Sequence, residues 1–197
     1  MTIRRHLAHL AQFDRRSPAQ RLSGRLPRLL VLSDDARGFI IEKQLAAWPH
    51  GAAFIERAFG KTVQTKVKQA HAPLRLATCS PRMARKANLD GIHWPEKRLK
   101  FRRASAVTGL IETASAHHGL AIAKSARLGI SIILVSTAFA SNSPSATRPL
   151  GALRLAKLQS MFPNVSLYGL GGVTSSKIKA IWRTGIYGVA LVSFKSS

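Results

Sequence analysis

The strongest chemical signal in the sequence is the glycine turn Gly169-Leu170-Gly171-Gly172-Val173-Thr174, which lies between a predicted strand and a predicted helix. Glycines there let backbone N–H groups approach an anion, and the N-terminus of the following helix adds a favourable dipole. The alternative is a tight turn that only needs positive φ angles. A later strand ends in Val192-Ser193 and would supply further donors. We expect Gly171, Gly172, Val192 and Ser193 to form a phosphate cradle.

Other side chains could take part in acid–base or nucleophilic chemistry. His93 and His117 lie at predicted strand ends, where an imidazole can exchange protons near neutral pH. A hydrogen-bonded structural histidine is the alternative for both. Asp34 and Asp35 follow a predicted first strand and could face a site or cap a helix. Cys79 has no evident base beside it in the sequence.

The elements that must position these residues follow an alternating pattern. Short apolar runs alternate with longer amphipathic stretches, which is typical of a parallel sheet covered by helices. The expected strands are residues 29–32, 52–56, 74–77, 90–93, 107–114, 130–135, 165–168 and 187–192. The expected helices are residues 39–48, a basic stretch reaching about residue 70, and residues 81–88, 118–128, 150–161 and 175–183, with 94–105 as a loop. Eight such units predict an α/β fold, a single (β/α)8 TIM barrel, with an open doubly wound sheet as the alternative.

The two ends of the chain depart from a complete barrel. Only Ser193 to Ser197 follow the eighth strand, so we expect a truncated last helix. Residues 1–27 are expected to form a basic N-terminal extension that covers the gap, and residues 28–197 the barrel. The full length of 197 residues fits one domain of this kind with short loops.

The charge of the chain is strongly positive. Its 31 Lys and Arg residues against 8 Asp and Glu give a formal net charge of +23. Such an excess attracts polyanions, although cations spread along the chain could also be a generally basic surface without a partner. Aromatic residues make up only 7% of the chain, so we expect no nucleic-acid partner.

The sequence also bears on location. We see no apolar run long enough to span a bilayer and no secretory signal, and the lone Cys79 cannot form an internal disulfide. We therefore expect no membrane association and a cytoplasmic location, with an N-terminal transit peptide as the alternative.

An ordered set of segments resembles the thiamine phosphate synthase/TenI family. The segments are Leu29 to Asp34, Asp90-Gly91-Ile92-His93, Ser115-Ala116-His117, Ile132 to Phe139, Pro149-Leu150-Gly151, the glycine turn, and Gly188 to Ser193. The resemblance covers about residues 28–194. It implies a (β/α)8 barrel with ligands at the carboxyl ends of the strands.

The same resemblance implies a reaction. The family joins a pyrimidine diphosphate to a thiazole phosphate and releases pyrophosphate, with Mg2+ and basic residues taking the charge of the leaving group. By its motifs, Arg57 would hold pyrophosphate. The contacts to pyrophosphate or to the thiazole phosphate would come from Ser115, Ser141 and Ser143.

Other family positions have changed. The metal-binding carboxylates fall on Cys79 and Arg98, and neither a thiol nor a guanidinium replaces an oxygen ligand of Mg2+. The catalytic histidine of the TenI branch falls on about Thr137. We therefore expect no Mg2+ site of the family type and no other cofactor.

The sequence thus predicts a thiamine phosphate synthase-like protein that condenses hydroxymethylpyrimidine diphosphate with a thiazole phosphate, or only binds such phosphates. The candidate catalytic residues are Arg57, His93 and His117. The alternative is a non-catalytic barrel that binds phosphate or a polyanion through its basic surface. The oligomeric state does not follow from the sequence.

Overall fold

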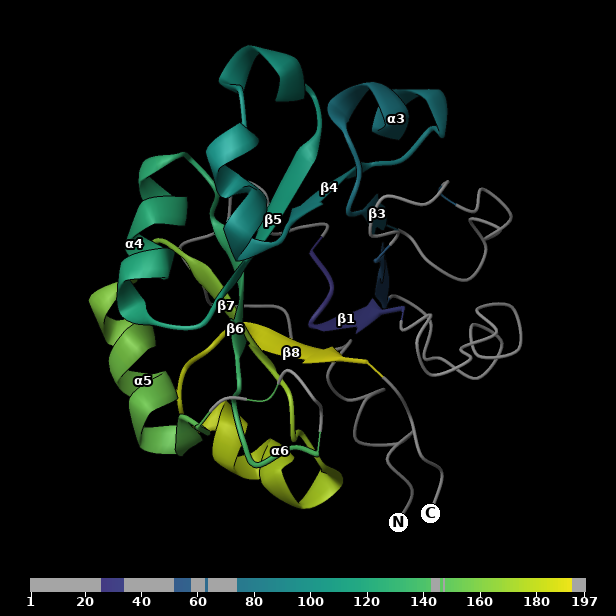
Figure 1. Ribbon diagram of the computed structural model, residues 1–197. Coiled ribbons are helices and arrows are strands. Elements are labelled where there is room, and N and C mark those ends of the chain that lie inside the picture. Colours follow the sequence, from purple (N-terminus) through teal and green to yellow (C-terminus); the bar gives the residue numbers. More distant parts are fainter. Residues whose placement is uncertain are drawn as a thin grey trace.

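Eight parallel strands close into a barrel in sequence order. The computed structural model describes residues 26–33, 52–57, 63, 74–142, 146 and 148–192. Closure comes from the pairing of the first strand with the eighth, in which Leu30 lies opposite Ala190. The prediction of a (β/α)8 barrel is confirmed, and the open sheet is wrong (Figure 1).

The strands are short and match the expected apolar runs closely. They are β1 (Leu29–Leu32), β2 (Ala53–Glu56), β3 (Arg75–Ala77), β4 (Gly91–Trp94), β5 (Ile111–Ala116), β6 (Ile132–Ser136), β7 (Ser166–Leu170) and β8 (Gly188–Leu191). The helices are α3 (Pro81–Lys86), α4 (Gly119–Arg127), α5 (Gly151–Met161) and α6 (Ser175–Trp182), with the 3-10 helices η3 (Glu96–Phe101) and η4 (Ala104–Val107). The two helices expected before residue 71, residues 1–25 of the expected extension and the chain after residue 192 lie outside the described residues.

The segment between β4 and β5 differs from the expectation of a loop. It forms η3 and η4, and Val107, expected to begin the fifth strand, is the last residue of η4. Val107 is apolar because it is buried with Leu99 and Ile92 on the outside of the sheet. The side chain of Arg102 forms two hydrogen bonds of 2.7 Å with the Glu112 carboxylate, which fastens the segment to β5.

The barrel separates two apolar layers. Alternate side chains of the strands point inward and pack on one another, and the others pack outward against the helices. Tyr168 of β7 fills the amino-terminal half of the interior and donates a hydrogen bond of 2.8 Å to the Pro27 carbonyl. Tyr187 makes a matching bond of 2.9 Å to the Leu26 carbonyl. The two tyrosines thereby attach the chain before β1 to this end of the barrel.

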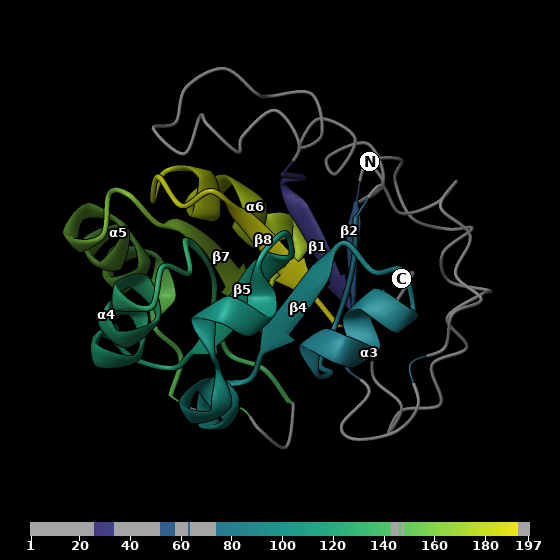
Figure 2. The ribbon, with the colours of Figure 1, turned by 90° about the horizontal axis from the view of Figure 1, so that it is seen from above.

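The helices that the structure describes lie on two sides of the barrel. α4, α5 and α6 follow one another around one side, while α3 lies on the other, as two views at right angles show (Figures 1 and 2). The carboxyl ends of all eight strands point to the same end because every neighbouring pair is parallel. That end is where a site is expected in this architecture.

The close packing beside Tyr168 gives a stability prediction. A Cβ atom at Gly188 would lie 2.3 Å from the Arg28 carbonyl oxygen and 2.8 Å from the Tyr168 ring. We expect Gly188→Ala to lower the free energy of unfolding by about 3 kcal/mol, because backbone and a buried ring must both shift. Gly109→Ala is the control, since that site is open and its φ of +79° should cost only about 1 kcal/mol. Urea denaturation of both variants checks the prediction, and equal losses would contradict it.

Candidate functional site

The mouth of the barrel gathers polar side chains from successive strands. Arg57, Thr78, His93 and Ser115 each continue the inward-pointing row of their strand at its carboxyl end. The inner apolar cluster supplies the residues two positions before Arg57 and Thr78. The interior is therefore polar at the carboxyl ends of the strands and apolar at their amino ends, around Tyr168.

His93 lies at the centre of this polar layer. Its side chain is 2% exposed, its Nδ1 atom is 2.8 Å from Thr113 Oγ1, and its Nε2 atom is 2.8 Å from Ser115 Oγ. Burial and, to a smaller extent, the nearby positive charge of Arg57 together lower the pKa of His93 from its usual 6.5 to about 3. The ring is neutral at pH 7, and this geometry favours a positioning role.

A neutral imidazole has one N–H group, so its two hydroxyl partners must behave differently. If Thr113 donates to Nδ1, then Nε2–H donates to Ser115 and leaves the Ser115 hydrogen free for a ligand. If Nδ1–H donates to Thr113, then Ser115 must donate to Nε2 and can only accept from a ligand. The tautomer of His93 therefore determines whether Ser115 acts as a donor or an acceptor.

Arg57 is fixed at the end of β2 by the end of β1. Its backbone N–H donates a hydrogen bond of 2.7 Å to Ser33 Oγ, and its Nε–H donates to the Ser33 carbonyl. Ser33 is itself 1% exposed, so this anchor is rigid. The influence of Arg57 on the pKa of His93 shows that the two side chains share the mouth.

The glycine turn has the positive φ angles that the simpler interpretation requires, +92° at Gly171 and +63° at Gly172. A Cβ atom at Gly172 would lie 2.2 Å from the Ala140 carbonyl oxygen. The Phe139 N–H donates a hydrogen bond of 3.0 Å to the Gly171 carbonyl. The turn after β7 is thus locked to the loop after β6, which also carries Ser141.

Lys177 adds a positive charge beside this turn, and the sequence analysis did not single it out. Its Nζ atom is 3.4 Å from the Gly172 carbonyl oxygen and 5.3 Å from the centre of the Phe139 ring. The signal that could have identified it is its position in the first turn of α6, immediately after the glycine turn. A lysine there can reach an anion held by the turn.

His117 lies apart from the His93 group, at the rim. Its Nδ1 atom is 2.8 Å from Glu96 Oε2, and the neighbouring His118 Nε2 is 3.4 Å from Glu96 Oε1. Burial alone would raise the pKa of Glu96, but hydrogen bonds from the side chain and backbone of His117 and the charges of both histidines bring it below its usual value. His118 also caps α4, because its Nδ1 atom accepts from the Ala121 N–H. Glu96 thus joins η3 to the start of α4.

The described residues do not provide the oxygen ligands that Mg2+ prefers. Within these ranges the carboxylates serve elsewhere: Asp90 accepts from the Arg75 N–H, Glu96 holds the histidines, and Glu112 holds Arg102. The fourth, Glu56, is buried and lies close enough to Cys79 to affect its thiol. No group of three potential metal-ligating side chains occurs among the residues described.

The remaining candidates are placed as follows. Burial and the charge of Glu56 raise the pKa of Cys79 to about 11, so the thiol is protonated at neutral pH and is a poor nucleophile. Arg98 is exposed on η3. Val192 packs against the inner core at the end of β8. The candidates that lie outside the described residues are Asp34, Asp35, Ser143 and Ser193.

The family model described as thiamine monophosphate synthase matches residues 57–194, which include the whole polar mouth from Arg57 onward. The chain belongs to this family. The match also covers both glycine-containing segments at the ends of β7 and β8.

Individual relatives agree with this membership. This chain is 33% identical over 105 residues to a protein of Aquifex aeolicus (strain VF5) named "Putative thiamine-phosphate synthase 2". The aligned region covers 53% of this chain and 56% of that relative. The fold of this chain is similar to that of thiamine phosphate pyrophosphorylase from Pyrococcus furiosus. The TM-score is 0.63, the identity is 18%, and the match covers 84% of this chain and 85% of that one. The fold is also similar to that of FabK from Thermotoga maritima, with a TM-score of 0.65, 10% identity and coverage of 91% and 62%.

The neutral state of His93 gives a pH prediction. Its folded pKa of about 3 lies below the usual 6.5, so between these values the unfolded chain binds a proton that the folded chain does not. The contribution of His93 to the free energy of unfolding should therefore be complete above pH 6.5. Below pH 6.5 it should fall by about 1.4 kcal/mol per pH unit. Urea denaturation at pH 7 and pH 5 should show this loss in the wild type and not in His93→Gln.

The exposed His118 provides the matched control for this measurement. His118→Gln should keep the same loss of stability between pH 7 and pH 5 as the wild type. Equal pH dependence in wild type and His93→Gln would contradict the assignment of a buried, neutral His93.

Proposed function

We propose that this family member binds phosphorylated thiamine precursors at the mouth of its barrel and condenses hydroxymethylpyrimidine diphosphate with a thiazole phosphate. The observation that carries the proposal is the convergence of Arg57, His93 and Ser115 on one polar layer at the carboxyl ends of β2, β4 and β5. A fixed guanidinium and an oriented hydroxyl are the groups that bind an anionic leaving group. A cytoplasmic location belongs to the same proposal.

In this proposal the bond between the pyrimidine methylene carbon and the diphosphate oxygen breaks, and the diphosphate departs with the electron pair. The thiazole nitrogen then forms the new bond to that carbon. Arg57 stabilises the negative charge that develops on the departing oxygens, because its own position is fixed by Ser33 before the reaction begins. Ser115 donates to the same group when Thr113 donates to His93.

The thiazole phosphate would bind on the opposite part of the mouth. Backbone N–H groups of Gly171 and Gly172, the end of β8 at Val192 and the ammonium of Lys177 are suited to one phosphate. Ser141 belongs to the loop locked against this turn, and Ser143 and Ser193 would extend the same cradle. Two separate anion subsites would thus hold the two substrates.

The second candidate is a barrel that binds these phosphates without condensing them. Its support is the dispersal of the described carboxylates, which leaves no ligand set of the kind that Mg2+ prefers in these ranges. An assay of thiamine phosphate formation from both precursors, with and without Mg2+, separates the two candidates. Binding of both precursors with no product under either condition would favour the second.

Arg57 should discriminate between the two anion subsites. We expect Arg57→Ala to weaken pyrophosphate binding about tenfold or more and to leave a simple alkyl monophosphate almost unaffected, because a guanidinium binds its anion through charge-assisted hydrogen bonds at a separate subsite. Isothermal titration calorimetry with both ligands measures the difference. Gly171→Leu should give the reverse order, and equal losses for both ligands in both variants would indicate a general charge effect.

Thr113 should act on pyrophosphate only through His93 and Ser115. Thr113→Val removes the hydrogen-bond partner of His93 Nδ1, so we expect weaker pyrophosphate binding and a change in the 15N chemical shifts of the His93 ring. Thr108→Val, at an exposed hydroxyl bonded to the Ser105 carbonyl, is the control. Unchanged 15N chemical shifts of the His93 ring in Thr113→Val would contradict an effect that passes from Thr113 through His93 to Ser115.

A further inference from the structure

The chain after Glu112 carries no acidic side chain. All eight Asp and Glu residues lie at or before Glu112, although lysines and arginines continue to the C-terminus. The part of the chain after Glu112 includes α4, α5 and α6, the three helices that cover one side of the barrel (Figures 1 and 2). The outer surface of these helices is therefore exclusively positive in charge at neutral pH.

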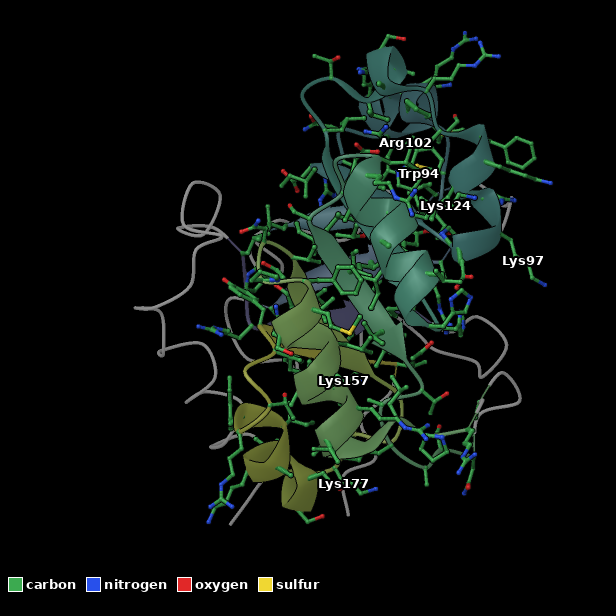
Figure 3. The ribbon with its side chains drawn as sticks, turned by 90° about the vertical axis from the view of Figure 1, so that its left-hand side faces the viewer. Trp94, Lys97, Arg102, Lys124, Lys157 and Lys177 are labelled. Atoms are coloured by element: carbon green, nitrogen blue, oxygen red, sulfur yellow. The ribbon has the colours of Figure 1, made fainter. Side chains whose placement is uncertain are left out.

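The three helices form one continuous surface. Residues of all three pack into the same outer core against β6 and β7. A Cβ atom at Gly119 of α4 would lie in contact with the Leu158 side chain of α5, which shows how closely these two helices approach. Figure 3 looks onto this side of the molecule and shows Lys124, Lys157 and Lys177 along it.

We define the basic helical face by its exposed cations on the three helices. Its members are Lys124, Arg127, Arg154, Lys157 and Lys179. Among the residues that the structure describes, none of the five has an ion-pair partner. The face thus has a high positive charge, and the three helices that form it carry no carboxylate of their own.

Large apolar side chains project from the same face. Leu120 of α4 is 76% exposed, Leu153 of α5 is 85% exposed, and Met161 at the end of α5 is 57% exposed. Leu120 lies four residues before Lys124, and Leu153 lies four residues before Lys157, so each leucine shares the outer side of its helix with a lysine. Exposed leucines between lysines differ from the charged surface of an ordinary soluble barrel.

We propose that the basic helical face binds the surface of a bilayer that contains anionic phospholipids. The cations would contact the lipid phosphates, while the exposed leucines and Met161 would enter the boundary between headgroups and acyl chains. This mode of binding needs no spanning helix, and none of the described helices is long and apolar enough to cross a bilayer. The proposal departs from the expectation from the sequence that no membrane takes part.

Two other occupants fit the face less well. A second copy of the chain would bring two surfaces of the same charge together, which costs energy. Single-stranded nucleic acid would match the charge, but the large apolar residues exposed on this face are aliphatic and offer no platform for stacking bases. Among the described residues, the large exposed aromatic side chain is Phe101, which belongs to η3 and not to the three helices of this face.

The face lies on the side of the barrel, so membrane binding would leave the mouth at the strand ends accessible. The proposal is independent of the proposed function, because none of the five cations contacts Arg57, His93 or Ser115. Failure of either proposal would leave the other intact.

Sedimentation of the full chain with lipid vesicles tests the proposal. We expect binding to vesicles of phosphatidylcholine mixed with phosphatidylglycerol, weaker binding at high salt, and little binding to phosphatidylcholine alone. The double variant Lys124→Gln/Lys157→Gln should reduce the partition coefficient about 25-fold, at about fivefold for each lysine. Leu120→Gln/Leu153→Gln should reduce it about tenfold or more by removing the inserted apolar area.

The matched control is Arg82→Gln/Lys86→Gln, which removes the same charge from exposed positions of α3. An equal loss in this control would overturn the proposal in favour of a general effect of net charge. Unchanged vesicle binding in the leucine variant, with tighter binding to a single-stranded RNA oligonucleotide, would also overturn it and indicate a nucleic-acid surface. Far-UV circular dichroism of each variant verifies that the barrel remains folded.

Discussion

The hydrogen bonds between β1 and β8 are the constraint on which the rest of the structure depends. They close a sheet of short strands, and closure brings the carboxyl ends of all eight strands into one ring. Residues as distant in sequence as Arg57 and Ser115 then share a small polar volume. Without closure, the side chains at these strand ends would lie along an open edge and could not surround one anion.

Closure also requires that the interior be filled, and the chain fills its two halves differently. The amino-terminal half contains Tyr168, whose hydroxyl is satisfied by the Pro27 carbonyl. The carboxyl-terminal half contains His93, whose two nitrogens are satisfied by two hydroxyls of β5. An unpaired polar atom at either place would cost about 1–3 kcal/mol, so both side chains are held in defined orientations. The apolar half stabilises the barrel, and the polar half holds the groups that would face a ligand in the proposed function.

The sequence predicted the elements well where local signals decide them. The run Leu29 to Leu32 has the residue types of a strand buried on both faces, and β1 covers the same residues. The chain between β4 and β5 was harder to predict, because the burial of Val107 depends on tertiary contacts with Leu99 and Ile92, which belong to η3 and β4. Apolar character alone does not distinguish a strand residue from the anchor of a short helix.

The sequence singles out the members of the candidate site but not the contacts between them. His93 and Ser115 could each be singled out, but the bond between them depends on the register that places His93 opposite Thr113. Cross-strand register follows from the closed barrel and is not visible in a single strand. The charge of Lys177 at the glycine turn was missed because its importance depends on the packing of the turn against Phe139.

The contact of Gly172 with the backbone of Phe139 and Ala140 couples the shapes of two loops. Because no side chain lies between them, the backbone of one loop forms the packing surface of the other. In the proposed site, a ligand that shifts Phe139 and Ala140 would therefore also shift the turn that would hold the thiazole phosphate.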